Sequence, residues 1–221
     1  MKTSMDPIWD KIHSSKEWGQ YPAEHIIRFV ARNYYNCNRK NVKILDFGMG
    51  GGAHTWYLAR EGFDTYAFDG SEFAVQRTQN KLDRENLCAN VRKLDGLYLD
   101  YPDNYFDAVI DNVSIDANKL IDITSMYKAI YKILKPSGKL CTVCFDKNTT
   151  GYGTGEQVEK DTFTNMTEGI FKTSGLHHFF DKESISHLLT DVGFKEIKHE
   201  SLAYTDAGNT ISEIITTCVK K

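Results

Sequence analysis

Four glycines and three carboxylates carry the clearest chemical signal in this sequence. Residues 46–53 read Asp-Phe-Gly-Met-Gly-Gly-Gly-Ala, so an apolar run passes directly into a glycine-rich loop. Glycines let the backbone approach a ligand closely, and a helix after such a loop offers free N–H groups to a polar or negative ligand. Asp46, Asp69 and Asp95 each end a short apolar run. Three carboxylates at successive strand ends suit a ligand that carries an amine, a ribose and a purine.

The same loop also fits a dinucleotide-binding pattern. Gly48, Gly50 and Ala53 satisfy G-x-G-x-x-A, and Asp69 follows about 20 residues later. Asp46 argues against this ligand, because a carboxylate beside the loop would repel a pyrophosphate and would pair with a cationic amine. No hydride-transfer dyad or second catalytic domain is evident. A nicotinamide oxidoreductase therefore remains the weaker alternative.

The elements that must position these residues alternate between apolar runs and amphipathic stretches. We predict strands at 42–47, 64–69, 90–95, 105–111 and 138–146, and helices at 53–61, 71–87, about 118–135 and 181–191. Two β-rich runs, 194–204 and 210–219, can pair as an antiparallel hairpin. The alternation predicts an α/β protein with a Rossmann-like, doubly wound, seven-stranded and mostly parallel sheet that ends in this antiparallel C-terminal hairpin.

A length of 221 residues favours a single domain over two independent cores. Within 1–221 we expect an N-terminal helical lid at 1–40, a ligand-binding core at 42–146, and a C-terminal helix and β-hairpin at 181–221. Between them, residues 147–180 contain five glycines and many aromatic side chains without a clear period. A segment of this length is too long for a bare connection, so we interpret it as a substrate or lid insertion.

On these residues the chain resembles the class I S-adenosylmethionine-dependent methyltransferases of small-molecule type, over about residues 42–219. The motifs that carry the resemblance are Asp46-x-Gly48-x-Gly50-x-Gly52, Phe68-Asp69-Gly70-Ser71, Lys93-Leu94-Asp95-Gly96, Tyr105-Phe106-Asp107-Ala108-Val109 and the helix end Ile133 to Leu140. Each motif is modest alone, and their order is specific.

The resemblance implies S-adenosyl-L-methionine as cofactor and assigns residues to its parts. The implied contacts are Asp46, Gly48 and Gly50 for the methionine moiety, Asp69 with Gly70 and Ser71 for the ribose, Asp95 and Gly96 for the adenine, and Asp111 and Asn112 beside the sulfonium. Trp18 and Tyr21 lie where related enzymes place a helical lid. An aromatic face there would attract the sulfonium by roughly 0.5 to 2 kcal/mol, although both side chains could equally anchor the N-terminal helices.

Two histidines are the candidate catalytic residues. His177 and His178 end the insertion, and either could act as a general base for a hydroxyl or ammonium acceptor. The alternative is that both pack beside Phe179 and Phe180 and help to start the helix at Asp181. The expected reaction is methyl transfer to a small polar metabolite or sugar. A non-catalytic, S-adenosylmethionine-binding regulatory module is the other alternative.

Composition excludes several further classes. The chain has 27 Lys plus Arg against 30 Asp plus Glu, a net charge of −3, which disfavours nucleic acid as a partner. Its five cysteines are scattered, and the start lacks the apolar run of a secretory signal, so we expect a cytoplasmic protein. No apolar run is long enough to cross a membrane. Cys141 and Cys144 would point to opposite faces of one strand, so no metal site is expected. The identity of the acceptor and the oligomeric state are left open.

Overall fold

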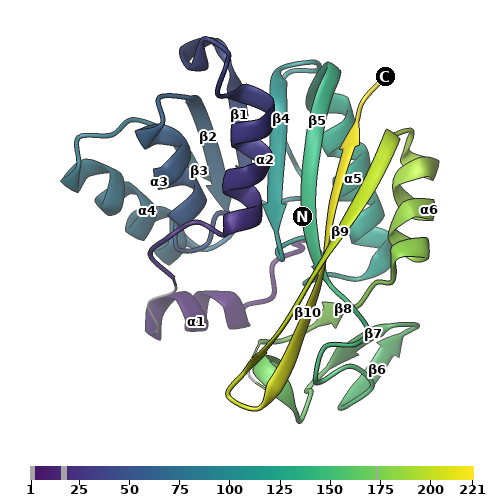
Figure 1. Cartoon of the computed structure of the whole chain (residues 1–221). Helices are drawn as coiled ribbons and strands as arrows, with labels where there is room; N and C mark the ends of the chain where they lie inside the picture. The colour runs from purple at the N-terminus through teal and green to yellow at the C-terminus, as the bar shows by residue number, and fades with distance from the viewer. Residues whose placement is uncertain (1–2, 16–18, 173) are drawn as a thin grey trace.

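A seven-stranded sheet forms the centre of the computed structural model, which describes residues 3–15, 19–172 and 174–221 (Figure 1). Its strand order is β3-β2-β1-β4-β5-β10-β9. The strands are β1 (Lys43–Phe47), β2 (Asp64–Asp69), β3 (Asn90–Lys93), β4 (Phe106–Asn112), β5 (Leu134–Phe145), β9 (Lys195–Asp206) and β10 (Asn209–Val219). Neighbours from β3 to β5 are parallel, and β10 is antiparallel to both β5 and β9. The predicted α/β sheet with its antiparallel hairpin is confirmed.

Helices cover both faces of this sheet. They are α2 (Glu24–Tyr34), α3 (Ala53–Arg60), α4 (Glu72–Arg84), α5 (Leu120–Ile133) and α6 (Lys182–Val192). Helix α1 (Ile8–Ser15) lies beyond the strand ends (Figure 1), and η1 (Arg39–Asn41) and η2 (Gly169–Phe171) are short 3-10 turns. Apolar side chains of α5 and α6 pack on one face, and those of α2 and α3 pack on the other. No helix in the described ranges is long and apolar enough to span a membrane.

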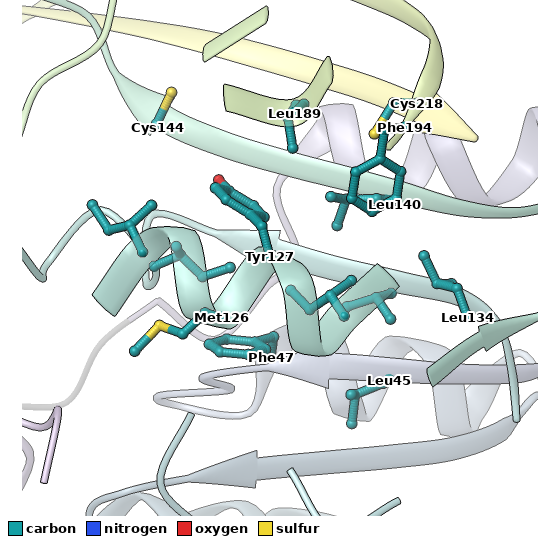
Figure 2. Close-up of a cluster of buried hydrophobic side chains, with 14 of the residues drawn as sticks. Leu45, Phe47, Met126, Tyr127, Leu134, Leu140, Cys144, Leu189, Phe194 and Cys218 are labelled. Atoms are coloured by element: carbon teal, nitrogen blue, oxygen red, sulfur yellow. The ribbon is translucent and has the colours of Figure 1, made fainter. Parts of the chain in front are cut away.

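The alternation of side chains along β5 divides the core into two halves. Cys141 lies in the cluster under α2, whereas Cys144 lies in the cluster under α5 and α6, as expected for residues three apart on a strand. Figure 2 shows the second cluster, in which Tyr127 points from α5 toward the strand that carries Cys144. The Tyr127 hydroxyl meets the Thr142 hydroxyl at 2.9 Å, so this buried polar group has a partner.

Local sequence accounts for the boundaries of α6. Asp181 caps its first turn by accepting a hydrogen bond from Ser184 N at 2.7 Å, and the Ser184 hydroxyl accepts one from Asp181 N at 3.0 Å. The helix ends at Gly193, which has a φ of 117°. The predicted helix at 181–191 therefore lies within one residue of the observed one.

The junction between α5 and β5 differs from the prediction. The helix ends at Ile133 and the strand begins at once, so residues that we assigned to a helix end and a turn lie in an irregular first part of β5. The register with β4 jumps from Phe106 opposite Leu134 to Ala108 opposite Lys139. Pro136 has no N–H to give to a ladder, which explains why regular pairing starts only at Lys139.

The insertion at 147–180 folds into a second, three-stranded antiparallel sheet. Its strands are β6 (Glu156–Glu159), β7 (Thr162–Thr164) and β8 (His177–His178). They are only two to four residues long, which is too short for a periodic pattern to appear in the sequence. Phe145, Phe163, Phe171 and Phe179 form the main part of a separate apolar cluster beneath them.

Hydrogen bonds attach this second sheet to the hairpin. The Thr149 hydroxyl donates to Ser212 O at 2.6 Å and accepts from Ser212 N at 3.0 Å, and Thr150 N donates to Thr210 O at 2.9 Å. Ser212 and Thr210 both belong to β10. The insertion and α1 lie together at the lower end of the main sheet in Figure 1, where the parallel strands end.

Candidate functional site

A cavity of about 1200 Å³ lies at the carboxyl ends of the parallel strands, bordered by α1 and the insertion. Open α/β sheets bind ligands at this edge, because loops and helix N-termini converge there. The walls include the loop after β1, the ends of β2 and β4, and residues around η2.

The glycine loop after β1 forms one wall through its backbone. Gly48 has a φ of 65°, and a Cβ there would lie 1.8 Å from the Ser114 Oγ. Gly50 has a φ of 50°, but a Cβ at this position would lie 3.6 Å from its nearest neighbour, His13 Cε1. Both glycines line the cavity. A Cβ at Gly50 would therefore meet His13 at ordinary van der Waals distance, while Gly48 is required for packing against the β4 end.

Asp69 ends β2 and holds two parts of the wall together. Its carboxylate accepts hydrogen bonds from Gly50 N and Ser71 N, each at 2.9 Å. Burial raises the pKa of Asp69, which the two backbone donors and nearby His13 oppose. Each carboxylate oxygen has a second lone pair, so this group can still accept from hydroxyls of a ligand.

Asp95 is engaged by the N-terminal segment. It accepts hydrogen bonds from Ser4 N, Ser4 Oγ and Thr3 Oγ1 at 2.7 Å each, and from Leu97 N at 2.9 Å. Partial burial alone would raise the pKa of Asp95, but these donors lower it below its ordinary value. Four protein donors match the four acceptor positions of a carboxylate, so an adenine amine would have to share or displace one of them.

Helix α1 and the residues before it cover the cavity. Met5 packs so closely on Gly70 that a Cβ there would lie 2.6 Å from the Met5 sulfur. Farther along, Arg77 of α4 donates to His13 O at 2.7 Å. The Trp9 ring lies edge-on to the His177 ring, with 6.0 Å between centroids. This cover thus contacts the loop after β2, helix α4 and the insertion.

The structure divides the residues that we predicted for the site. Those lining the cavity are Gly48, Gly50, Asp69, Gly70, Asp95, Gly96, Asn112, Tyr21 and His177. Those buried behind the wall are Asp46, Ser71, Asp111 and His178. Trp18 lies outside the described residues.

Asp46 and Asp111 support the backbone of the wall from behind. The Thr55 hydroxyl donates to Asp46 at 2.7 Å, and burial raises the pKa of Asp46 to about 7. Asp111 accepts from Ser114 N at 3.1 Å and Ile115 N at 3.2 Å, and burial raises its pKa to about 6. Asp46 is thus bound to α3, and Asp111 holds the turn after β4.

The two adjacent histidines have different surroundings. The His177 ring lines the cavity, and its Nε2 lies 3.1 Å from the Ser174 hydroxyl. Because that hydroxyl donates to Phe171 O at 3.2 Å, Nε2 carries the proton in this pair, and Nδ1 has a free lone pair. In the described part of the chain Nδ1 is buried without a hydrogen-bond partner. Burial lowers the pKa of His177 to about 4, so the ring is neutral at pH 7.

His178 points away from this cavity. Its Nδ1 lies 2.7 Å from the Thr162 hydroxyl, and its ring packs on Phe180 with 4.4 Å between centroids. Its backbone N donates to Asp116 O at 2.7 Å. Burial lowers the pKa of His178 to about 4 as well. The described contacts of this side chain are those of a packed residue.

Sequence reasoning missed several lining residues. They are His13 of α1, Phe145 at the end of β5, and Phe171 and Ser174 of the insertion. None belongs to a motif. The signal available was weak: His13 follows Trp9 by four residues, which places both on one face of a helix.

The chain matches a known family over its central part. Residues 44–138 match the family described as a methyltransferase domain. The chain is also similar to the sterol 24-C-methyltransferase of Yarrowia lipolytica, with 27% identity over 75% of the chain and 42% of that protein. It thus spans less than half of the length of this relative.

Two further proteins show the same likeness. The ubiquinone/menaquinone biosynthesis C-methyltransferase of Pectobacterium carotovorum is 24% identical over 74% of the chain and 70% of its own length. A solved S-adenosylmethionine-dependent methyltransferase of Methanosarcina mazei superposes with a TM-score of 0.73 at 20% identity, covering 90% of the chain and 98% of that structure. The structural likeness shows a shared fold.

Proposed function

We propose that this chain is a class I S-adenosylmethionine-dependent methyltransferase that transfers a methyl group to a small polar metabolite or sugar. The observation that carries the proposal is the continuity of the cavity. The same space is lined by Gly50 and Asp69 on one side and by Phe171 and His177 on the other, with Asn112 at the β4 end also on its wall. A cofactor and an acceptor can therefore meet in one continuous site.

The residues on the cofactor side fit S-adenosylmethionine. The backbone at Gly50, which lines the cavity, can take the methionine end, and Asp69 can accept from the two ribose hydroxyls while it keeps its backbone donors. Gly96 lines the cavity beside Asp95, where the adenine would lie. When bound, S-adenosylmethionine supplies a methyl group made electrophilic by its sulfonium. We assign α1 and the segment before it the role of a lid.

On the acceptor side, orientation is the main task of the chain. Methyl transfer needs the acceptor atom in line with the methyl group and sulfur, so positioning supplies most of the acceleration. Trp9 and Phe171 offer apolar faces, and the His177 ring lines the cavity beside them. With its pKa near 4, His177 is a weak base, and we assign it orientation first and proton removal second.

Polar groups on the acceptor side of the cavity support a polar acceptor. Lys11, Asn165 and Lys172 line the cavity together with the aromatic residues. The names of the relatives refer to sterols and to quinone biosynthesis, which supports a small molecule as the acceptor. The mixed walls favour an acceptor with an apolar face and several hydrogen-bonding groups.

Calorimetric titration tests the proposal directly. S-adenosylmethionine and S-adenosylhomocysteine should bind with micromolar or tighter dissociation constants, which corresponds to about 8 kcal/mol. NAD should show no heat of binding. Saturable NAD binding without S-adenosylhomocysteine binding would refute the assignment. Binding of S-adenosylmethionine and S-adenosylhomocysteine, with no methyl transfer to any member of a metabolite panel, would favour the alternative of a non-catalytic regulatory module.

A further inference from the structure

A second cavity of about 520 Å³ adjoins the site between α2 and the β9–β10 hairpin. Ala23 and Asn112 line both cavities, so the two spaces lie next to each other at the end of β4. The walls of the second cavity carry charged side chains from three elements: Glu24 and Arg28 of α2, Glu200 of β9 and Glu213 of β10. An acceptor bound next to the cofactor can extend into this space.

One carboxylate on these walls has no ion-pair partner among the described residues. Arg28 pairs with Glu24 at 3.4 Å and with Glu200 at 2.9 Å, and Arg32 also pairs with Glu200, at 3.2 Å. The side chain of Glu213 makes no hydrogen bond and no ion pair with any described residue, and burial raises its pKa. It lies on a strand between buried isoleucines at 211, 214 and 215. A half-buried acid in such surroundings costs free energy unless it meets a donor.

His25 supplies a second unused acceptor. Its side chain is only 7% exposed, and its Nε2 lies 2.7 Å from Asn112 Oδ1. An amide oxygen accepts and does not donate, so Nε2 carries the proton and Nδ1 has the lone pair. Burial lowers the pKa of His25, so the ring is neutral near pH 7. Nδ1 has no hydrogen-bond partner among the described residues, although the ring forms part of the cavity wall.

We propose that this second cavity is a subsite for an ammonium group on the acceptor, held by Glu213 and by His25. The inference rests on the proposed function and adds a substrate class to it: a small metabolite with a protonated amine. An ammonium group has three donors and no acceptor, which matches the two oxygens of the unneutralised Glu213 carboxylate and the His25 Nδ1. The charged groups that face this space are Glu24, Arg28, Glu200 and Glu213, with the Tyr204 hydroxyl beside them.

The test uses two probes of nearly equal shape, benzylammonium and benzyl alcohol, with the protein saturated with S-adenosylhomocysteine at pH 7.5. Binding is followed by NMR of labelled isoleucine and leucine methyl groups. Ile215 and Leu202 line the second cavity, while Ile170 lines the first. We expect benzylammonium to shift Ile215 and Leu202 and to bind at least tenfold more tightly than the alcohol.

The matched variants are Glu213→Gln and Glu196→Gln. Glutamine keeps the size of Glu213 and removes its charge, so benzylammonium should bind roughly tenfold to hundredfold more weakly and the alcohol should bind as before. Glu196 lies on the same hairpin but pairs with Lys221 outside the cavity, and its variant should bind both probes as the wild type does.

Three results would overturn the subsite: equal affinities of the wild type for the two probes, an amine affinity unchanged in Glu213→Gln, or shifts confined to Ile170. The first comparison needs no variant, so it holds even if Glu213→Gln fails to fold. Calorimetry of S-adenosylhomocysteine on each protein separates the two proposals. If this ligand does not bind the wild type, the proposed function fails; if it binds while the amine preference is missing, only the subsite fails.

Discussion

Replacing Asp69 with alanine should damage both the fold and the cofactor site, by amounts that can be measured separately. The substitution removes the acceptor of two hydrogen bonds of 2.9 Å, from Gly50 N and Ser71 N. Hydrogen bonds to a charged group contribute about 1.5 to 3 kcal/mol each. The carboxylate is buried, and its removal returns part of that energy, since burial raises its pKa. We expect a net loss of about 2 to 3 kcal/mol in the free energy of unfolding.

Urea unfolding without ligand measures the first effect, and calorimetry with S-adenosylhomocysteine measures the second. Loss of an acceptor for two ribose hydroxyls should weaken affinity by at least about tenfold, or 1.4 kcal/mol. The control is Asp64→Ala at the other end of β2, where a partly exposed ion pair with Lys43 is worth at most about 1 kcal/mol. If Asp69→Ala loses affinity for S-adenosylhomocysteine but keeps the wild-type free energy of unfolding, the hydrogen bonds of Asp69 do not stabilise the fold. Lost stability with wild-type affinity would refute its contact with the ribose.

Three further predictions concern the lid and the histidines. Asp95→Asn should speed tryptic cleavage after Lys11 several-fold, because three hydrogen bonds from residues 3 and 4 end on this carboxylate; an unchanged cleavage rate would contradict it. His177→Ala should lower turnover about tenfold or more at unchanged S-adenosylhomocysteine affinity. His178→Ala should instead lower the melting temperature and leave the turnover of the folded enzyme unchanged. The reverse pattern would exchange the roles of the two histidines. The folded pKa of His177, about 4, lies below its ordinary 6.5, so its stabilising effect is full above pH 6.5 and is lost as pH falls toward 4. Between pH 7 and pH 5 the wild type should therefore lose about 2 kcal/mol more than His177→Gln in urea unfolding, and equal losses would be inconsistent with a buried neutral ring.

The parallel half of the fold was predictable because its signals are local. A buried strand such as β1 appears as a short apolar run, and the glycines after it indicate a loop whatever the rest of the chain does. Asp69 could be placed at the cavity for the same reason, since it directly ends β2. Parallel strands end at one edge, so residues in these positions converge.

The partners of Asp95 were not predictable, because Ser4 lies 91 residues away in the sequence and belongs to no motif.

The choice between His177 and His178 could not be predicted for a different reason. Neighbouring residues on a strand point to opposite sides, so one of the pair must face away from the cavity. Which one does so depends on how β8 pairs with β7, and strands this short leave no periodic pattern.

The attachment of the insertion to β10 has a consequence for the order in which the protein is built. The bonds that Thr149 and Thr150 make with Ser212 and Thr210 join a segment in the middle of the chain to the last strand of the main sheet. During synthesis from the N-terminus, β1 to β4 and the glycine loop emerge well before β10 does. We therefore expect a nascent chain to gain its nucleoside-binding edge early, and to complete the acceptor wall only when β10 has left the ribosome.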